Sequence, residues 1–452
     1  GGNFITTGNG QFNLANDGSF AYTPAAGFSG TDTFTYNVGN STAAVTFRVT
    51  RRAIFVRNDA AAGGNGTQVA PFDTLAAALT AADRDGDIIF IFRGVGTTAH
   101  AGTIVIPRQG QSLVGEGDGL ATAQGVVVAP GDFPVVDQRI VANFDDIVVA
   151  GIRSEGAAGG LTATDCSGLT VRNNQFVNPI GVSDSVSLSN LSGAIRVTNN
   201  LFRHNATSGT AVSAVQNTGA GQFTVSNNAF AATANNSGSA VVLDLSGTAS
   251  VTLTAQNNAG TGPDAGQGFR DGYLLVAQGS SRIAATIASN SLNGAQGSGL
   301  GIITTGTAEV SGTIASNNFT NLGSRGVVTE ALAASTQTLT VRNNTLGGGL
   351  DSFFGNFGTG TALFGLRNNI FQNNTSVARD VQVQNSSTGT VGLDFTGNTL
   401  VTLALLNLAG VFNVEDFGVA GAGLLALNTL TAVTVAGLED ITPVANDSLL
   451  IP

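Results

Sequence analysis

A short phrase recurs along most of this 452-residue chain: an apolar residue, about two polar residues, Asn, one further residue, and then Phe or Leu. Residues 171–176, 197–202 and 225–230 are clear copies, and in the copy near residue 314 the register drifts by one residue. The copies lie about 28 residues apart, and a period of roughly 20 to 50 residues indicates a solenoid or a repeat array. The recurring Asn residues are Asn174, Asn200, Asn228, Asn258, Asn290, Asn318, Asn344, Asn369, Asn398 and Asn428.

The content of each period is typical of β-strands. Val, Ile, Thr and Phe occur in short alternating runs, and Gly and Asn separate the runs. Helical repeats would need long stretches rich in Leu, Ala, Glu and Lys, which the chain lacks. We therefore expect an all-β fold whose main part, residues 51–440, is a single-stranded parallel β-helix of about 12 coils.

The recurring Asn has a physical role in such a fold. Coils stack about 4.8 Å apart, so one Asn at the same turn of every coil forms a column. Each amide can then hydrogen bond to the next, as in stacked cross-β ladders, and Asn tolerates the left-handed backbone of a tight turn. A structural asparagine ladder is the main interpretation. The alternative is that these residues form a carbohydrate- or ice-binding array.

The beginning of the solenoid contains one helical pattern. Residues 71–83 predict a short helix with Asp73 or Thr74 as its N-cap and with Leu75, Leu79 and Ala82 on one face. A helix at this place would cap the open end of the stacked strands.

The same region resembles the right-handed parallel β-helices of large bacterial secreted and surface proteins. The resemblance extends over about residues 51–440 and implies the fold, including its handedness, but no particular activity. The segments that carry it are residues 54–58 (IFVRN), 63–67 (GGNGT), 71–75 (PFDTL), 85–88 (DGDI) and 113–117 (LVGEG).

The first 50 residues differ from the rest. Residues 16–18 (NDG) are typical of a hairpin turn, and the aromatic residues that follow alternate as in the core of a β-sandwich. Residues 16–38 resemble the Ig-like, cadherin-like repeats of bacterial adhesins. We therefore predict an Ig-like β-sandwich over residues 1–50. Its expected core residues are Phe4, Phe12, Phe20, Tyr22, Phe34 and Tyr36.

That sandwich lacks a strand, because domains of this kind normally begin with a Pro-Val-Ala-Asn-Asp signature. The signature occurs instead at residues 443–447, near the other end of the chain. Residues 441–452 are therefore predicted to be a donor strand that completes the sandwich of the next subunit and so builds a filament. The alternatives are one period of a giant tandem-repeat adhesin and a remnant of a lost domain. The expected interface residues are Val444, Ala445, Asn446, Leu449, Leu450 and Ile451.

The sequence predicts no catalytic site. The β-helix fold also serves pectate lyases and polygalacturonases, but this chain has no Lys and only two His residues, His100 and His204. The adjacent pair Asp145 and Asp146 precedes a strand, so we interpret it as a solvated turn rather than a catalytic dyad. Residues 83–87 (DRDGD) begin like a calcium loop but lack its terminal Glu, which favours a turn.

Composition limits partners and cofactors. A net charge of −11 and the single Cys166 exclude a basic nucleic-acid surface and a disulfide framework. We expect no metal or cofactor, with one alternative: a calcium ion shared by Asn16, Asp17, Asn446 and Asp447. The apolar residues 421–438 are interrupted by Asn and Thr, so we expect no membrane span.

These observations predict a structural subunit of an extracellular or cell-surface filament whose partners are other copies of itself, arranged head to tail. Because the sequence starts with Gly-Gly, we expect a processed product or a segment of a longer chain. The competing interpretations are a pectate-lyase-like, polysaccharide-active β-helix protein and an adhesin that binds surface or matrix glycans. The absence of Trp and the three Tyr residues argue against sugar stacking.

Overall fold

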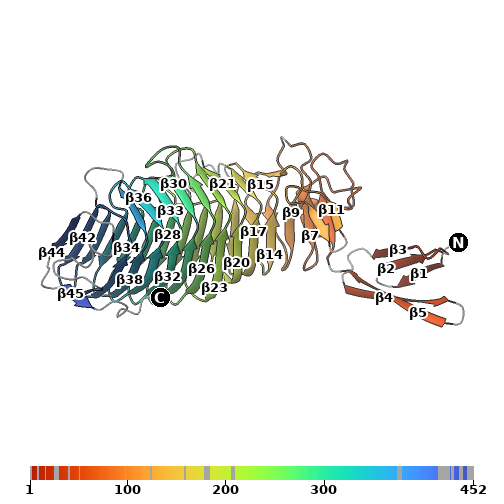
Figure 1. Ribbon diagram of the computed structural model, residues 1–452. Helices are drawn as coiled ribbons and strands as arrows, with labels where there is room; N and C mark the ends of the chain where they lie inside the picture. Colours follow the sequence, from red (N-terminus) through yellow and green to blue (C-terminus); the bar gives the residue numbers. More distant parts are fainter. Residues whose placement is uncertain are drawn as a thin grey trace.

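The computed structural model consists of a small β-sandwich followed by a long parallel β-helix, with a single helix among the described residues (Figure 1). The structure describes the chain except residues 1–2, 8–9, 16, 25–29, 39–40, 50, 97, 123–124, 157–158, 178–183, 205–208, 374–378, 416–427, 429–431, 437–440 and 445–452.

Each coil of the β-helix contributes one strand to each of three parallel sheets. In one coil these are β16 (Leu161–Thr164), β17 (Ser167–Arg172) and β18 (Gln175–Val177). The next coil repeats them as β19 (Val186–Ser189), β20 (Ser192–Thr198) and β21 (Leu201–His204). Over the described residues the three sheets contain 13, 15 and 10 strands, respectively. The repeat period therefore corresponds to one coil, and the fold is the right-handed parallel β-helix expected from the sequence.

Inward-facing side chains of successive coils stack on their equivalents. Phe176 pairs in register with Phe202, and Phe202 with Phe230 of β24 (Ala229–Ala232). Their rings lie 5.1 Å apart at each step and are nearly parallel. All three are buried, so the apolar residues of the repeat form one continuous core along the rod.

The N-terminal end of the β-helix is covered by α1 (Leu75–Ala81), which is shorter than the helix predicted over residues 71–83. Of the two expected N-caps it is Thr74 whose side chain accepts a hydrogen bond from the Ala77 backbone N–H. Leu75, Ala78 and Ala82 are buried in the core of the first coils. The helix lies against β6 (Ala53–Val56) and β7 (Ile88–Ile91), as a cap should.

Two arginines fasten the start of the β-helix. Arg52 donates hydrogen bonds to the carboxylates of Asp83 and Asp87 and to the Ala81 carbonyl. Arg51 donates to the carbonyls of Gly86 and Gly110 and to the Ser112 hydroxyl. The end of the Ig-like domain is thus anchored to three successive coils.

A second apolar cluster lies on the outer face of the 15-stranded sheet at this end. Phe55, Phe90 and Val114 of β9 (Ser112–Gly115) are buried there. The antiparallel hairpin of β10 (Leu120–Thr122) and β11 (Gly125–Val128) packs on them through Leu120 and Val128. The hairpin therefore covers an apolar outer surface that would otherwise face solvent.

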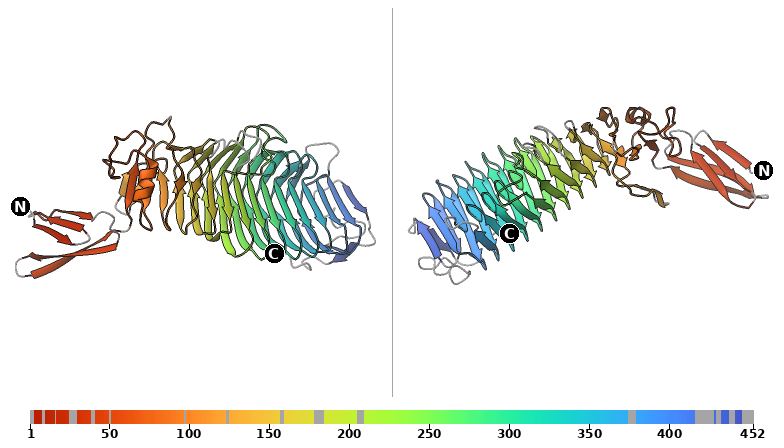
Figure 2. Two further views of the ribbon diagram at one scale, coloured as in Figure 1. Left: turned by 180° about the vertical axis from the view of Figure 1, so that it is seen from behind. Right: turned by 90° about the horizontal axis from the view of Figure 1, so that it is seen from above.

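The Ig-like domain consists of two antiparallel sheets. One contains β1 (Asn3–Thr7), β2 (Gly10–Leu14) and β3 (Phe20–Pro24), and the other contains β4 (Gly30–Val38) and β5 (Ser41–Val49). β1 lies against β4, which closes one side of the sandwich. In both views of Figure 2 the domain lies beyond the N-terminal end of the β-helix.

The opposite end of the rod contains β43 (Val411–Glu415), β44 (Ala432–Ala436) and β45 (Ile441–Val444) (Figure 1). β45 pairs in parallel with β43, with Phe412 opposite Ile441 and Glu415 opposite Val444. Residues 441–444, the first part of the predicted donor strand, extend the 15-stranded sheet of the β-helix. The rest of that predicted strand, residues 445–452, lies outside the described residues.

Within the described residues, no helix has the length and apolar character that crossing a membrane requires.

Candidate functional site

A column of amide side chains runs along the turns between the 15-stranded and the 10-stranded sheets. Each Nδ2 donates to Oδ1 of the next Asn at 2.9–3.1 Å and to a backbone carbonyl of the preceding coil. Each Oδ1 also accepts a backbone N–H of the preceding coil. The column comprises Asn174, Asn200, Asn228, Asn258, Asn290, Asn317, Asn344, Asn369, Asn398 and Asn428.

Asn318 was the wrong choice of residue in the copy where the register drifts. Asn317 is buried and bonds to Asn290 and Asn344. Asn318 is exposed and begins β33 (Asn318–Leu322). The turn decides this, because the residue before each column position from Asn174 to Asn398 adopts positive φ, and in this coil that residue is Ser316, with φ of 57°.

The left-handed conformation therefore belongs to the residue before the column, not to the column Asn itself. Six of these turn positions hold Asn, for example Asn343, whereas Ser289 and Ser316 adopt the same φ of 56–57°. Ser has no amide that favours this region, so both residues are strained there.

We expect Ser316→Asn to raise the free energy of unfolding by about 0.5–1 kcal/mol. Ser311→Asn is the control, because Ser311 is an exposed residue in the middle of β32 (Glu309–Ala315). The measurement is the midpoint of denaturant unfolding for the two variants. Equal midpoints would contradict the proposed strain.

Burial overturns the alternative of a binding array. The column side chains are between 0 and 9% exposed, so neither a glycan nor an ice surface can reach them. The column therefore acts within the molecule, where it fixes the spacing of the coils.

Ser185, His204 and Asn236 form a buried cluster that superficially resembles a hydrolase triad. The Asn236 Nδ2–H donates to His204 Nδ1 at 3.2 Å, and its Oδ1 is held by the Gly238 N–H. The imidazole proton is therefore on Nε2, which donates to the Ser185 hydroxyl at 2.9 Å. A ring in this tautomer cannot accept the Ser185 proton, and burial lowers the pKa of His204 to about 4.

The other titratable candidates are also committed to structural contacts. His100 is buried and hydrogen bonds to the Phe92 carbonyl. Asp145 accepts the Ser167 N–H, and Asp146 is an exposed turn residue with φ of 57°. Burial, with lesser contributions from Asp145 and Asp165, raises the pKa of Cys166 to about 11, which makes this thiol unreactive.

The two calcium candidates have different outcomes. Arg52 neutralises Asp83 and Asp87, which removes the carboxylates that a calcium loop would need. Asp17 accepts the Ser19 N–H and hydroxyl, and those two bonds lower its pKa. Asn16, Asn446 and Asp447 lie outside the described residues. No group of three His, Cys, Asp or Glu side chains in the described part of the chain is placed to hold a metal ion.

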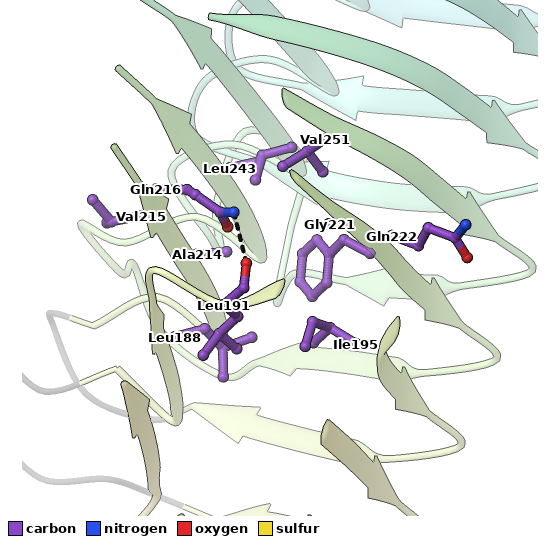
Figure 3. A pocket seen from close by; sticks show the side chains of 11 residues that line it. Leu188, Leu191, Ile195, Ala214, Val215, Gln216, Gly221, Gln222, Leu243 and Val251 are labelled. Carbon is purple, nitrogen blue, oxygen red and sulfur yellow. Dashed lines mark hydrogen bonds between the residues drawn. The ribbon is translucent and has the colours of Figure 1, made fainter. Parts of the chain in front are cut away.

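The apolar cavity in Figure 3 is too small for a ligand. It lies between the 13-stranded and 15-stranded sheets, is lined by side chains such as Leu188, Ile195 and Phe223, and has a volume of about 10 Å³. Gln216 donates to the Leu191 carbonyl at its edge. Such a space holds one water at most.

The Ig-like domain has a core of stacked aromatic rings. Phe12 lies 5.3 Å from Phe34 and 5.5 Å from Phe47, centroid to centroid. Tyr22 stacks flat on Phe47 at 4.2 Å and donates its hydroxyl proton to Asp32. Phe47 is not among the core residues predicted from the sequence. The alternation of residues 45, 47 and 49 (Val, Phe, Val) could have indicated it, because a core strand alternates in this way.

One side of this core is open. Phe12 and Phe34 are 2% and 1% exposed, whereas Phe20 on β3 is 61% exposed. The inward-facing residues of β5, among them Val45 and Phe47, are only half-buried. β3 and β5 are edge strands of their sheets, and Phe20 meets Phe47 between them at 5.8 Å. We call this gap between β3 and β5 the open side.

The remaining residues predicted for the sandwich core and for the subunit interface lie at several places in the structure. Phe4 lies on β1 opposite Asn13, and Tyr36 is a half-buried residue of β4. Val444 ends β45 at the far end of the rod. The other predicted interface residues, Ala445, Asn446, Leu449, Leu450 and Ile451, lie outside the described residues.

Comparisons with known proteins agree with the two folds. Residues 2–50 match the bacterial Ig domain family, and residues 56–262 match a family described as a protein of unknown function (DUF1565). No curated protein matches the sequence.

Three solved structures illustrate the similarity. The A-module of the mannuronan C-5 epimerase AlgE4 from Azotobacter vinelandii is 12% identical, with 86% of this chain and 97% of that chain covered and a TM-score of 0.29. The GH136 lacto-N-biosidase from Eubacterium ramulus is 11% identical, with 87% and 68% covered and a TM-score of 0.26. A rhamnogalacturonan lyase is 12% identical, with 87% of each chain covered and a TM-score of 0.21.

The chain therefore joins a bacterial Ig domain to a right-handed parallel β-helix, a combination that indicates a surface or extracellular protein.

Proposed function

We propose that this protein is a structural subunit of an extracellular fibre in which the segment after Val444 of one copy fills the open side of the Ig-like domain of the next. The observation that carries the proposal is the unequal burial of one aromatic core, in which Phe34 is covered and Phe20 is 61% exposed. An added strand between β3 and β5 would pair with an edge and cover those rings. Main-chain pairing to a sheet edge is a common way to bind an extended peptide.

Residues 445–452 cannot reach the open side of the Ig-like domain in the same chain. β45 and β6 are the two ends of a 15-stranded sheet, and 14 steps of about 4.8 Å separate them by roughly 65 Å. Residues 445–452 span at most about 28 Å. These residues could therefore reach only the open side of another copy, and a head-to-tail contact that does not close produces a filament.

The β-helix fits the role of a rigid stalk. Its core is continuous, its turns are fixed by the amide column, and Arg51 and Arg52 anchor the joint to the Ig-like domain. The proposed role is structural and not catalytic, and it needs no metal or cofactor. It predicts no turnover of pectin or alginate.

A chain that ends at Val444 is expected to remain monomeric where the full chain forms fibres. Light scattering after size exclusion and negative-stain microscopy measure this. A labelled peptide of residues 442–452 should bind the shortened chain and slow the amide hydrogen exchange of its N-terminal domain. Fibres from the shortened chain, or a full chain that neither polymerises nor binds the peptide, would refute donor-strand addition.

Two variants of β5 distinguish loss of the contact at the open side from a general effect of a new carboxylate on the strand. Val45 faces the open side, so Val45→Asp should abolish both peptide binding and fibre formation. Ala44 is an exposed residue of the same strand, and Ala44→Asp should leave both intact. Equal behaviour of the two variants would place the contact elsewhere.

A further inference from the structure

A cleft of about 580 Å³ lies on the outer face of the 15-stranded sheet, beside the anchored linker and next to the β10–β11 hairpin. Its floor includes Ser112, Val148 and Thr170, which stand in one register column on β9, β14 (Ile147–Ala150) and β17. Arg51 lines the cleft from the linker, and Arg172 lines it from the end of β17. The fold brings these residues together from segments up to 121 positions apart.

The charge of the cleft is opposite to that of the whole chain. The lining contains two arginines and one carboxylate, Asp118, in a protein whose net charge is −11. Asp118 pairs with Arg172 at 2.6 Å. Arg51 bonds to carbonyls and to the Ser112 hydroxyl, and no carboxylate pairs with it among the described residues. Arg196, exposed on β20, continues the floor column after Thr170.

The Arg51 guanidinium is fixed in one orientation by its own hydrogen bonds. Its Nε and Nη2 donate to fixed partners at 2.6–2.9 Å, so the side chain has one orientation before anything binds. The third guanidinium nitrogen, Nη1, takes no part in these bonds and can donate to a carboxylate, and a donor already held in place costs little entropy on binding.

Size and lining distinguish a sugar from a small ion. The volume corresponds to about twenty water molecules, far more than one inorganic anion needs. Val148 and other aliphatic side chains provide apolar contacts, and the half-buried Thr170 hydroxyl can bond to a sugar hydroxyl, whereas the buried Ser112 hydroxyl accepts from Arg51. We propose that this cleft binds a uronic acid unit of an acidic polysaccharide, with its carboxylate at Arg51 and Arg172.

Titration calorimetry of the full chain with tetragalacturonate tests the proposal. Binding is expected, it should weaken as salt is raised, and neutral maltotetraose should not bind. Thr170→Glu puts a competing carboxylate on the floor and should weaken binding at least about tenfold. Thr286 of β29 (Arg282–Ala288) stands in the same register column, four strands further along, so Thr286→Glu is the matched control.

Arg172→Gln removes a cation but leaves the cleft open, and it should also weaken binding while the melting temperature of the protein is kept. The proposal is overturned if the full chain does not bind tetragalacturonate, if both Glu variants bind equally well, or if sulfate binds as tightly as the sugar. The chain that ends at Val444 keeps the cleft, so it should still bind. The cleft and the fibre contact can therefore fail independently.

Discussion

Asn317→Ala is expected to lower the free energy of unfolding by about 3–5 kcal/mol. The buried Asn317 side chain donates to the Ile287 carbonyl at 2.8 Å and to Asn344 Oδ1 at 3.0 Å. It also accepts both the backbone and the side-chain N–H of Asn290. Alanine removes these four bonds. Asn344 Oδ1 then keeps only the bond from the backbone N–H of residue 317, and Asn290 Nδ2 keeps only its bond to the Ala255 carbonyl. The Asn290 backbone N–H loses the acceptor that Asn317 gave it, and a buried group left without a partner costs about 1–3 kcal/mol.

The neighbouring residue is the control. Asn318 is exposed, and Asn318→Ala should change the free energy of unfolding by no more than about 0.5 kcal/mol. Circular dichroism during denaturant unfolding measures both variants. If the two substitutions have the same effect, the column does not carry the stability assigned to it here.

Acidification is expected to destabilise the protein through His204. Burial holds the pKa of His204 at about 4, against about 6.5 in an unfolded chain. The unfolded state therefore binds the proton first as pH falls. The contribution of His204 to the free energy of unfolding is fully present above about pH 6.5. It is lost progressively as the pH falls towards 4, by about 3 kcal/mol in total.

His204→Gln keeps an amide in the cluster with Ser185 and Asn236 but removes the titration. Its unfolding free energy should vary less between pH 4 and pH 6.5 than that of the parent chain, by most of the same 3 kcal/mol. His100 is retained in both proteins, so its contribution cancels. Parallel pH profiles would mean that His204 is not the group responsible.

The sequence predicts the β-helix well because its signal is local and repeated. Each period carries the same order of apolar and turn residues. Because the coils stack in register, the structure of one coil is repeated in the others. The drift at Asn318 was the exception, since Asn317 and Asn318 both fit the phrase. The earlier pair Ser289 and Asn290 has the same order as Ser316 and Asn317, and it could have indicated the correct residue.

The sites depend on contacts that no local pattern contains. Residues 16–38 indicate a sandwich, but which edges meet follows from how the two sheets pack, and only that packing exposes Phe20 beside Phe47. Arg51 and Arg172 lie 121 positions apart, and the stacking of coils alone brings them to one cleft. The burial of His204 likewise results from neighbours in other coils, namely Asn236 and Phe269.

The direction of the sheet hydrogen bonds has a mechanical consequence. In a parallel β-helix these bonds run along the axis of the rod, so a pull on β45 loads the contacts of the last coil before any other. We expect the coils to detach one at a time, each releasing about 28 residues and up to roughly 95 Å of chain. Tension on the proposed fibre would then be absorbed by stepwise lengthening, while the coils nearer the anchored linker stay folded.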